Sequence, residues 1–191
     1  MVSKANKTRK SKRNFQIENN EKEWTSDRDY KKWVGKIRTV KKIRHSPKED
    51  LCAGKNSICK DDLGIPRKYM PQFTLRRAPF SQNPIKKFRK HIKEKYGINS
   101  YKSTRKAIDL KPSQGEISRV RVEGLLNDNV IDKMEVPLVI SKNDYIADGH
   151  HRWAAFRVKA PQKPIDVIVI DAPIKDVLGL AIEWGATSQK F

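Results

Sequence analysis

The sequence predicts an α+β fold for the second half of the chain, preceded by a basic region of helical and extended segments. Short apolar segments with strand or helix periodicity begin at about residue 107 and follow one another closely from there. The first residues hold almost no apolar side chains, and prolines and glycines interrupt the segment before residue 86. We therefore expect a disordered basic arm over 1–14, a basic helical and extended region over 15–106, and one folded domain over 107–191.

Positive charge is concentrated in the first 110 residues. The 191-residue chain has a formal net charge of +20. Residues 1–60 hold 18 Lys or Arg against 7 Asp or Glu, residues 61–110 hold 13 against 4, and residues 111–191 hold 11 of each. Such segregated charge is typical of polyanion binders, because each Lys or Arg near a phosphate releases a condensed counterion. We expect nucleic acid, with DNA favoured, as a partner; a solvated surface that only aids solubility is the alternative.

Two further properties of the composition limit the class of protein. No segment approaches the roughly 20 apolar residues that cross a bilayer, and no apolar run follows the basic N-terminus, so we expect no membrane partner and a cytoplasmic location. Cys52 and Cys59 have six residues between them, which fits neither the usual zinc-ligand spacing nor a disulfide framework. We expect both to be reduced thiols without a structural role.

Two helices are expected in the basic region. Between residues 20 and 43 apolar residues recur at helical spacing, and Trp33 and Ile37 form either an ordinary buried face or a surface that stacks on bases. The Pro- and Gly-rich segment 45–85 is expected to be extended, and within it residues 64–72 could wrap the core or position a substrate. A second helix is predicted over 84–95, ended by Gly97.

Basic residues of the arm and of this second helix are the candidates for contact with nucleic acid, through its backbone and without base specificity. They are Lys7, Arg9, Lys10, Arg13, Lys86, Lys87, Arg89 and Lys90.

The folded domain is predicted to mix short strands with helices. Apolar runs and alternations predict strands at 108–110, 137–141, 145–147 and 165–170, the last of them a central buried strand. Helical spacing predicts helices at 113–126, 149–158 and 174–184, and residues 142–144 supply a turn between two paired strands.

The strongest functional signal is Asp148-Gly-His-His-Arg152, between a short apolar strand and a helix. A glycine there lets the backbone approach a ligand closely, and the first amides of the helix suit a phosphate. Arg152 adds a charged fork, His150 and His151 can donate hydrogen bonds, and Asp148 could cap the helix or help hold a divalent ion. We predict that Asp148, Gly149, His150, His151 and Arg152 form a cofactor-binding corner for a phosphate group; an Asp-Gly turn with exposed histidines is the alternative.

This motif, followed by an aromatic residue and Ala-Ala, resembles the phosphate-binding motif of the ParB/sulfiredoxin superfamily, in the form found in free-serine kinases. The resemblance covers about 107–185 and implies a small mixed sheet with packed helices that binds ATP or a related nucleotide and Mg²⁺. Sulfiredoxins carry a reactive cysteine at the position of His150, and partition proteins carry a GERR-like box at 149–152, so the chain departs from both.

The resemblance also bears on catalysis. In the serine kinases a glutamate shortly after a Leu-x-Pro segment resembles a general base, and Glu116, after Leu110-Lys-Pro, is the nearest candidate here. Alternatively, Ser113 and Glu116 form a capping box at a helix start. Glu116 and His150 are the candidate catalytic residues, and Gln114 could contact a phosphate or base.

Residues 64–72, the Pro-Ser-Gln segment and the histidine motif together resemble ParB-like domains encoded by bacteriophages, which implies a phage origin and a cytoplasmic or virion-associated location. We expect an enzyme that performs phosphoryl transfer or ATP hydrolysis at 148–152, with nucleic acid as substrate or scaffold. Two alternatives stay open: a metal-dependent nuclease that uses Asp148, and a non-catalytic DNA-binding or virion-associated protein.

Overall fold

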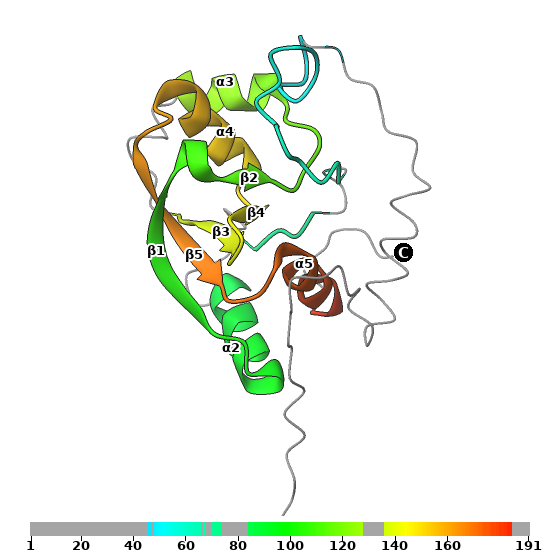
Figure 1. Ribbon diagram of the computed structural model, residues 1–191, viewed down its shortest axis with the longest axis vertical. Helices are drawn as coiled ribbons and strands as arrows, with labels where there is room; N and C mark the ends of the chain where they lie inside the picture. The colour runs from blue at the N-terminus through cyan, green and yellow to red at the C-terminus, as the bar shows by residue number, and fades with distance from the viewer. Residues whose placement is uncertain are drawn as a thin grey trace, which may run out of the picture.

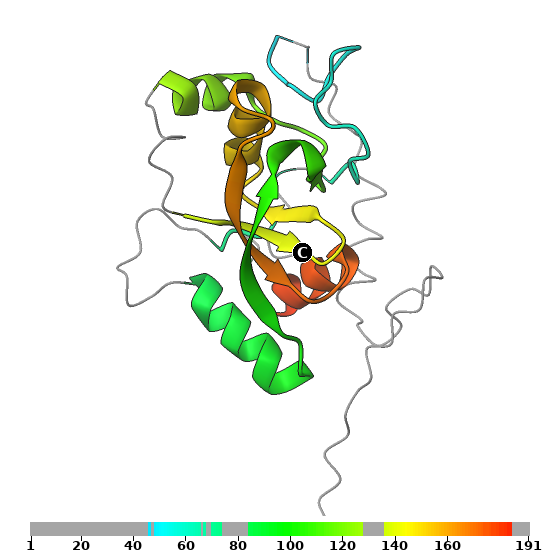
Figure 2. The ribbon, with the colours of Figure 1, turned by 60° about the vertical axis from the view of Figure 1, so that its left-hand side comes forward.

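The computed structural model describes residues 46, 48–65, 67, 70–73, 84–127 and 136–184. The arm expected over 1–14, with Lys7, Arg9, Lys10 and Arg13, lies outside the described residues, as does the helix expected between 20 and 43. The described part is a mixed sheet with helices packed on both faces, which confirms the α+β class (Figures 1 and 2). In this part of the chain, no helix combines the length and apolar content that crossing a membrane requires.

Five strands form one sheet in the order β1-β5-β3-β4-β2. β5 pairs antiparallel with β1 and parallel with β3, and β4 pairs antiparallel with β3 and parallel with β2. The apolar run of β5 thus lies between two neighbours and is buried on both faces, as its sequence predicts. The strands are β1 (Ser100–Lys106), β2 (Lys111–Pro112), β3 (Leu138–Ser141), β4 (Tyr145–Asp148) and β5 (Pro164–Ile170).

Two hydrophobic clusters cover the two faces of the sheet. On one face α2 and α5 pack through Phe88 and Leu178, and Phe73 stacks on Phe88 with the ring centroids 4.5 Å apart. On the other face α3 and α4 pack through Val122 and Trp153. The helices are α2 (Pro84–Tyr96), α3 (Arg119–Asn127), α4 (His150–Lys159) and α5 (Ile174–Glu183).

Two predicted elements between residues 107 and 127 differ from the structure. The strand expected at 108–110 is a 3₁₀ turn, Ala107–Asp109, followed by β2, because the Ile108 N–H donates to the carbonyl of Pro161 instead of to a strand. The helix expected from Ser113 begins only at Arg119. The Ser113 hydroxyl donates to the Ile146 carbonyl at 2.5 Å, so it does not cap a helix.

The folded unit begins before residue 107, where the charge balance changes. β1 has a polar sequence and was not predicted, yet all seven of its residues pair with β5. α2 ends at Gly97, which has a φ of 72°, and buries Ile85 and Ile92 against the same sheet. The predicted domain boundary at 107 therefore falls inside the fold, since charge reports on surface and not on strand pairing.

Cys52 and Cys59 form a disulfide, which corrects the prediction of reduced thiols. Their Cα atoms lie 4.9 Å apart because the loop folds back, with the Ile58 N–H donating to the carbonyl of Leu51. The Cys52 N–H donates to the buried carboxylate of Asp50. Sequence spacing does not show such a reversal, and a disulfide requires only that the two Cα atoms come within about 7 Å.

We expect Phe88→Ala to lower the free energy of unfolding by about 3 to 5 kcal/mol, because it empties a fully buried site between α2 and Phe73. Lys93→Ala, on the exposed side of the same helix, is the matched control and should change it by less than about 0.5 kcal/mol. Urea unfolding of both variants measures the difference. Equal stability of the two would show that α2 is not part of the core.

Candidate functional site

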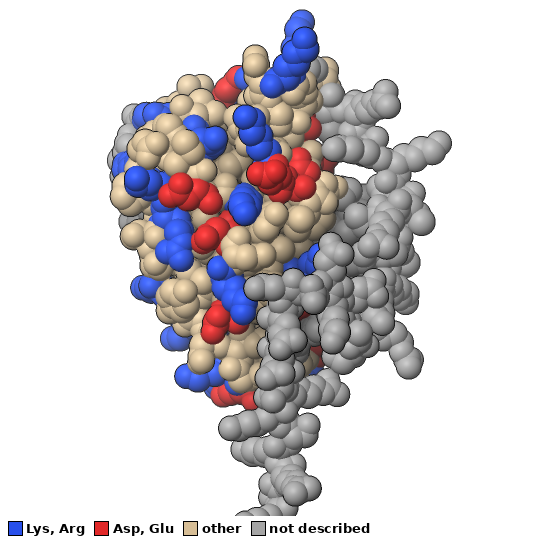
Figure 3. Space-filling model, in the orientation of Figure 1, with Lys and Arg blue, Asp and Glu red and all other residues tan. Residues whose placement is uncertain are grey.

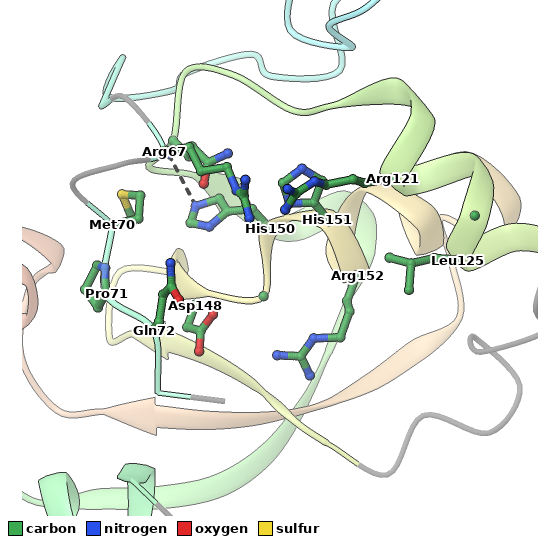
Figure 4. A pocket seen from close by; sticks show the side chains of 13 residues that line it. Arg67, Met70, Pro71, Gln72, Arg121, Leu125, Asp148, His150, His151 and Arg152 are labelled. Atoms are coloured by element: carbon green, nitrogen blue, oxygen red, sulfur yellow. Dashed lines mark hydrogen bonds between the residues drawn. The ribbon is translucent and has the colours of Figure 1, made fainter. Parts of the chain in front are cut away.

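A pocket of about 510 Å³ opens beside the start of α4 (Figure 4). Its walls come from three separate parts of the chain: the segment 67–72, the segment from Gln114 into α3, and the corner between β4 and α4. All five residues of the predicted phosphate site lie in it. The lining residues are Arg67, Met70, Pro71, Gln72, Gln114, Arg121, Gly124, Leu125, Asp148, Gly149, His150, His151 and Arg152.

Gly149 forms the corner from which α4 starts. Its φ is 102°, a backbone conformation that side chains disfavour. A Cβ added there would lie 2.5 Å from the Cδ2 atom of Leu138 and 2.9 Å from an Nη atom of Arg152. The first amides of α4 have no acceptors within the helix and carry the positive end of its dipole. The first amides of α4 therefore begin at a corner that packs against the side chains of Leu138 and Arg152.

The described residues between Gly64 and Phe73 lie along the site and are held there by hydrogen bonds. The Ile65 N–H donates to the carbonyl of Ser113 at 3.2 Å, and the Gly115 N–H donates back to the carbonyl of Ile65 at 2.9 Å. At the other end the Phe73 N–H donates to the Oδ2 of Asp148 at 2.9 Å. The segment expected to wrap the core or position a substrate thus forms one wall of the pocket. Asp148 holds this wall through its bond with Phe73, and the N-cap residue of α4 is Gly149.

His150 is buried and neutral. Its Nε2 lies 3.3 Å from the backbone nitrogens of both Ser113 and Gln114, and each of these N–H groups donates to it. Burial lowers the pKa of His150 to about 3, with a smaller contribution from His151, while a hydrogen bond with the Ile146 backbone opposes the shift. Protonation of Nε2 would break both hydrogen bonds, so the ring acts as a fixed acceptor.

His151 lies in a field of positive charge. Its Nε2 accepts the Ser118 N–H at 3.2 Å. Burial lowers the pKa of His151 to about 4, and Arg67 and Arg121 lower it further, against the opposing charge of Asp50. The pKa of Arg67 is itself lowered, first by burial and then by Arg121, with Glu116 acting in the opposite direction. The two guanidinium groups therefore repel each other beside the start of α4.

The pocket carries more positive than negative charge. Among the described residues that line it are three arginines, Arg67, Arg121 and Arg152, and one carboxylate, Asp148. In Figure 4, Arg67 and Arg121 lie on one side of the start of α4 and Arg152 lies on the other. The guanidinium of Arg152 also donates to the carbonyls of Val136 and Pro137, which joins α4 to the residues before β3. An anion is thus the ligand that this arrangement favours.

Of the other predicted site residues that the structure describes, Gln114 lines the pocket, whereas Glu116 and the basic residues of α2 do not. The Oε1 of Glu116 accepts the Arg67 N–H at 2.8 Å, so this carboxylate holds the wall that carries Arg67. The catalytic roles predicted for Glu116 and His150 stay predictions. Among the described residues there is no group of three or more His, Cys, Asp or Glu that could hold a metal ion. The basic residues of α2 do not line the pocket: Lys86, Lys87 and Lys90 are exposed, and Arg89 bonds Ser100.

Sequence reasoning did not assign Arg67 and Arg121 to the site. Arg67 lies in the segment predicted to wrap the core or position a substrate. Arg121, Gly124 and Leu125 are spaced as one face of a helix, and all three line the pocket. The spacing of these three residues in the sequence could have indicated a shared helix face. The local sequence does not show that this face lies beside residue 67.

Comparison of the chain with protein-family models, curated proteins and solved structures found no match. The case for a function therefore depends on the pocket and on the distribution of charge.

We expect Gly149→Ala to lower the free energy of unfolding by about 1 to 3 kcal/mol, because alanine is strained at this φ and its Cβ would clash with Leu138. Gly124→Ala is the matched control: it lies inside α3, an added Cβ meets nothing within 4 Å, and the variant should gain up to about 1 kcal/mol. Thermal and urea unfolding measure both. If Gly149→Ala matched the control, the corner would not need glycine.

The free energy of unfolding should fall as the pH is lowered from about 7 to 5. The unfolded chain takes up protons on His150 and His151 near pH 6.5, while the folded protein keeps both neutral down to about pH 3 and 4. Each histidine accounts for a loss on the order of 2 kcal/mol. Burial raises the pKa of Asp176 to about 6, which acts in the opposite direction, so Asp176→Asn is the background for the measurement.

In that background, His150→Gln should remove about half of the pH dependence in urea unfolding between pH 7 and 5. The slope against pH is compared, and not the absolute stability, because the substitution also changes packing. An unchanged slope would mean that His150 is charged in the folded protein.

Proposed function

We propose that the protein binds ATP or a related nucleotide through its phosphates at the start of α4, and that it transfers or hydrolyses the terminal phosphoryl group with nucleic acid as substrate or scaffold. The observation that carries the proposal is the charge of the pocket, whose described lining residues include three arginines and one carboxylate. A phosphate between Arg67 and Arg121 would relieve their mutual repulsion and accept charge-assisted hydrogen bonds from both.

Backbone geometry supports phosphate as the bound group. Gly149 and the first residues of α4 line the pocket, and helix starts commonly bind phosphates through their first amides. A volume of about 510 Å³ lies within the range of pockets for ligands of nucleotide size. Apolar atoms of Met70, Pro71 and Leu125 line the same pocket and offer contacts for the less polar part of such a ligand.

We propose that the carboxylate of Asp148 binds Mg²⁺ and lies beside the oxygen that reacts with the terminal phosphoryl group. Mg²⁺ commonly binds through one or two carboxylates together with the phosphates of the nucleotide, so the carboxylate of Asp148 in this pocket fits such an ion. When bound, the ion would neutralise charge that develops on the phosphates. The Phe73 N–H fixes Asp148 at Oδ2 and thereby orients its carboxylate.

We assign positioning roles to His150 and Glu116. His150 holds the amides of Ser113 and Gln114, and Glu116 holds the amide of Arg67, so both shape the pocket. This proposal agrees with the resemblance of 148–152 to the ParB/sulfiredoxin motif, and we propose that the mixed sheet belongs to that fold. A phosphate site fits this chain better than sulfinic acid reduction, because His150 stands where the reactive cysteine would be.

We expect ATP with Mg²⁺ to bind the full chain in isothermal titration calorimetry, and Arg67→Gln and Arg121→Gln each to weaken binding by about 10-fold or more, as loss of a charge-assisted hydrogen bond does. Arg157→Gln is the control, since Arg157 lies on α4 but does not line the pocket. ADP, GTP and CTP titrations identify the nucleotide. Absence of binding to all four, or an equal effect of the three variants, would contradict the proposal.

An assay of inorganic phosphate release, run beside these titrations, separates nucleotide binding from turnover. The Asp148→Asn variant should no longer release phosphate from the bound nucleotide. If the unaltered protein bound the nucleotide but released no phosphate, either with or without DNA, the protein would be a non-catalytic nucleotide- and DNA-binding protein and not an enzyme.

A further inference from the structure

A basic surface lies away from the pocket, on α2 and on the edge strand β1. We define the α2–β1 basic surface as the exposed side chains Lys86, Lys87, Lys90, Lys93, Lys102 and Lys106. None of the six lines the pocket. Lys and Arg side chains follow the left-hand edge of the molecule in Figure 3, where Figure 1 shows β1 and, below it, α2.

α2 presents its lysines to solvent because its apolar side is buried. Phe88 and Ile92 pack into the core. Lys86, Lys90 and Lys93 follow one another at intervals of four and three residues and so form one stripe, about 10 Å long at the rise of an α-helix. Arg89 turns toward the sheet and donates from Nε to the Ser100 hydroxyl at 2.7 Å. This contact fixes the helix to the start of β1 and with it the position of the stripe.

β1 adds two exposed lysines to this surface. Lys102 and Lys106 are four residues apart in a strand, so they project from the same side of the sheet, about 13 Å apart. Lys102 pairs with Ile168, which belongs to the cluster under α2, so this is the side on which α2 packs. Two carboxylates lie nearby: Glu94 pairs with Lys90 at 3.8 Å, and Asp166 stands opposite Thr104 on the neighbouring strand.

We propose that the α2–β1 basic surface binds the phosphate backbone of double-stranded DNA without reading its sequence. This surface is a second polyanion site, on elements other than those of the nucleotide pocket, and it stands whether or not the pocket binds a nucleotide. Rows of lysine ammonium groups act as point charges that match the regular charge of a duplex. β1 pairs with β5 in the sheet and α2 packs on a face of the same sheet, so one folded framework positions the backbone of both lysine-bearing elements.

Other polyanionic or protein partners fit this surface less well. An amphipathic helix on a membrane inserts its apolar side, and that side of α2 is in the core. Protein interfaces are depleted in lysine and rely on apolar or aromatic anchors, which the six side chains do not offer. Single-stranded nucleic acid is held by base stacking on aromatic rings. The exposed Tyr101 belongs to the opposite side of β1, next to Val169, so it cannot stack beside these lysines.

The test compares two variants of the full chain that remove the same charge. Lys90, Lys93, Lys102 and Lys106 are changed together to Gln in the first, and Lys55, Lys60, Lys142 and Lys175 in the second. All eight side chains are exposed, so both variants should fold, which circular dichroism checks. Binding of a duplex of random sequence is measured by fluorescence anisotropy over a range of salt concentrations.

We expect the first variant to lower the slope of log K against log salt by about 2 to 3, since each phosphate contact contributes about 0.9, and to weaken binding at low salt by about 100-fold. The second variant should change the slope by less than about 1. Equal effects in the two variants would overturn the proposal, because net charge alone would then explain binding. Tighter binding of single-stranded than of duplex DNA would overturn it as well.

Binding of ATP separates this proposal from the preceding one. Both quadruple variants should keep the nucleotide affinity of the unaltered chain, whereas Arg121→Gln should reduce it and leave the salt slope for DNA nearly unchanged. If the first quadruple variant did not fold, the pairs Lys90→Gln with Lys93→Gln and Lys102→Gln with Lys106→Gln would test the surface at about half the change in slope.

Discussion

The acceptor nitrogen of a buried histidine organises the pocket. Nε2 of His150 receives the N–H groups of Ser113 and Gln114, and these two residues in turn form the edge on which Ile65 pairs. Arg67 follows two residues later, and its amide is held by Glu116. Loss of the imidazole would leave two buried donors unpaired, at roughly 1 to 3 kcal/mol each, and would release the wall that carries Arg67.

Electrostatics distinguish the two basic regions of the fold. The pocket concentrates positive charge around the start of a helix, where partial burial limits screening by salt and the donors point in fixed directions. The lysines of α2 and β1 are exposed, so their attraction for a polyanion is shared among many contacts and weakens with salt. The pocket therefore suits a small anionic ligand of defined shape, and the α2–β1 basic surface suits a long polyanion with regularly spaced charges.

The pocket is assembled from segments that the fold brings together from far apart in the chain. Phe73 links the two proposed sites: its N–H holds Asp148, and its ring stacks on Phe88 of α2. Asp50, just before the loop closed by Cys52 and Cys59, accepts the N–H groups of Cys52 and Ile117. The next residue, Ser118, donates its N–H to His151 in the pocket. Changes in packing on either face should therefore reach the pocket.

The sequence by itself determined the elements whose pattern is local. Helical spacing identified α2, an apolar run identified β5, and the glycine between a short strand and two histidines identified the corner at the pocket. Tertiary structure alone decided the rest. β1 is a strand because β5 offers it seven partners, although its own sequence is polar. The Ser113 hydroxyl donates a hydrogen bond to the Ile146 carbonyl instead of capping a helix. Arg67 interacts electrostatically with Arg121 and His151, which lie far from it in the sequence. Contacts between residues so far apart in the sequence depend on how the loops close and on which groups are buried together. Neither can be inferred from the spacing of residues along the chain.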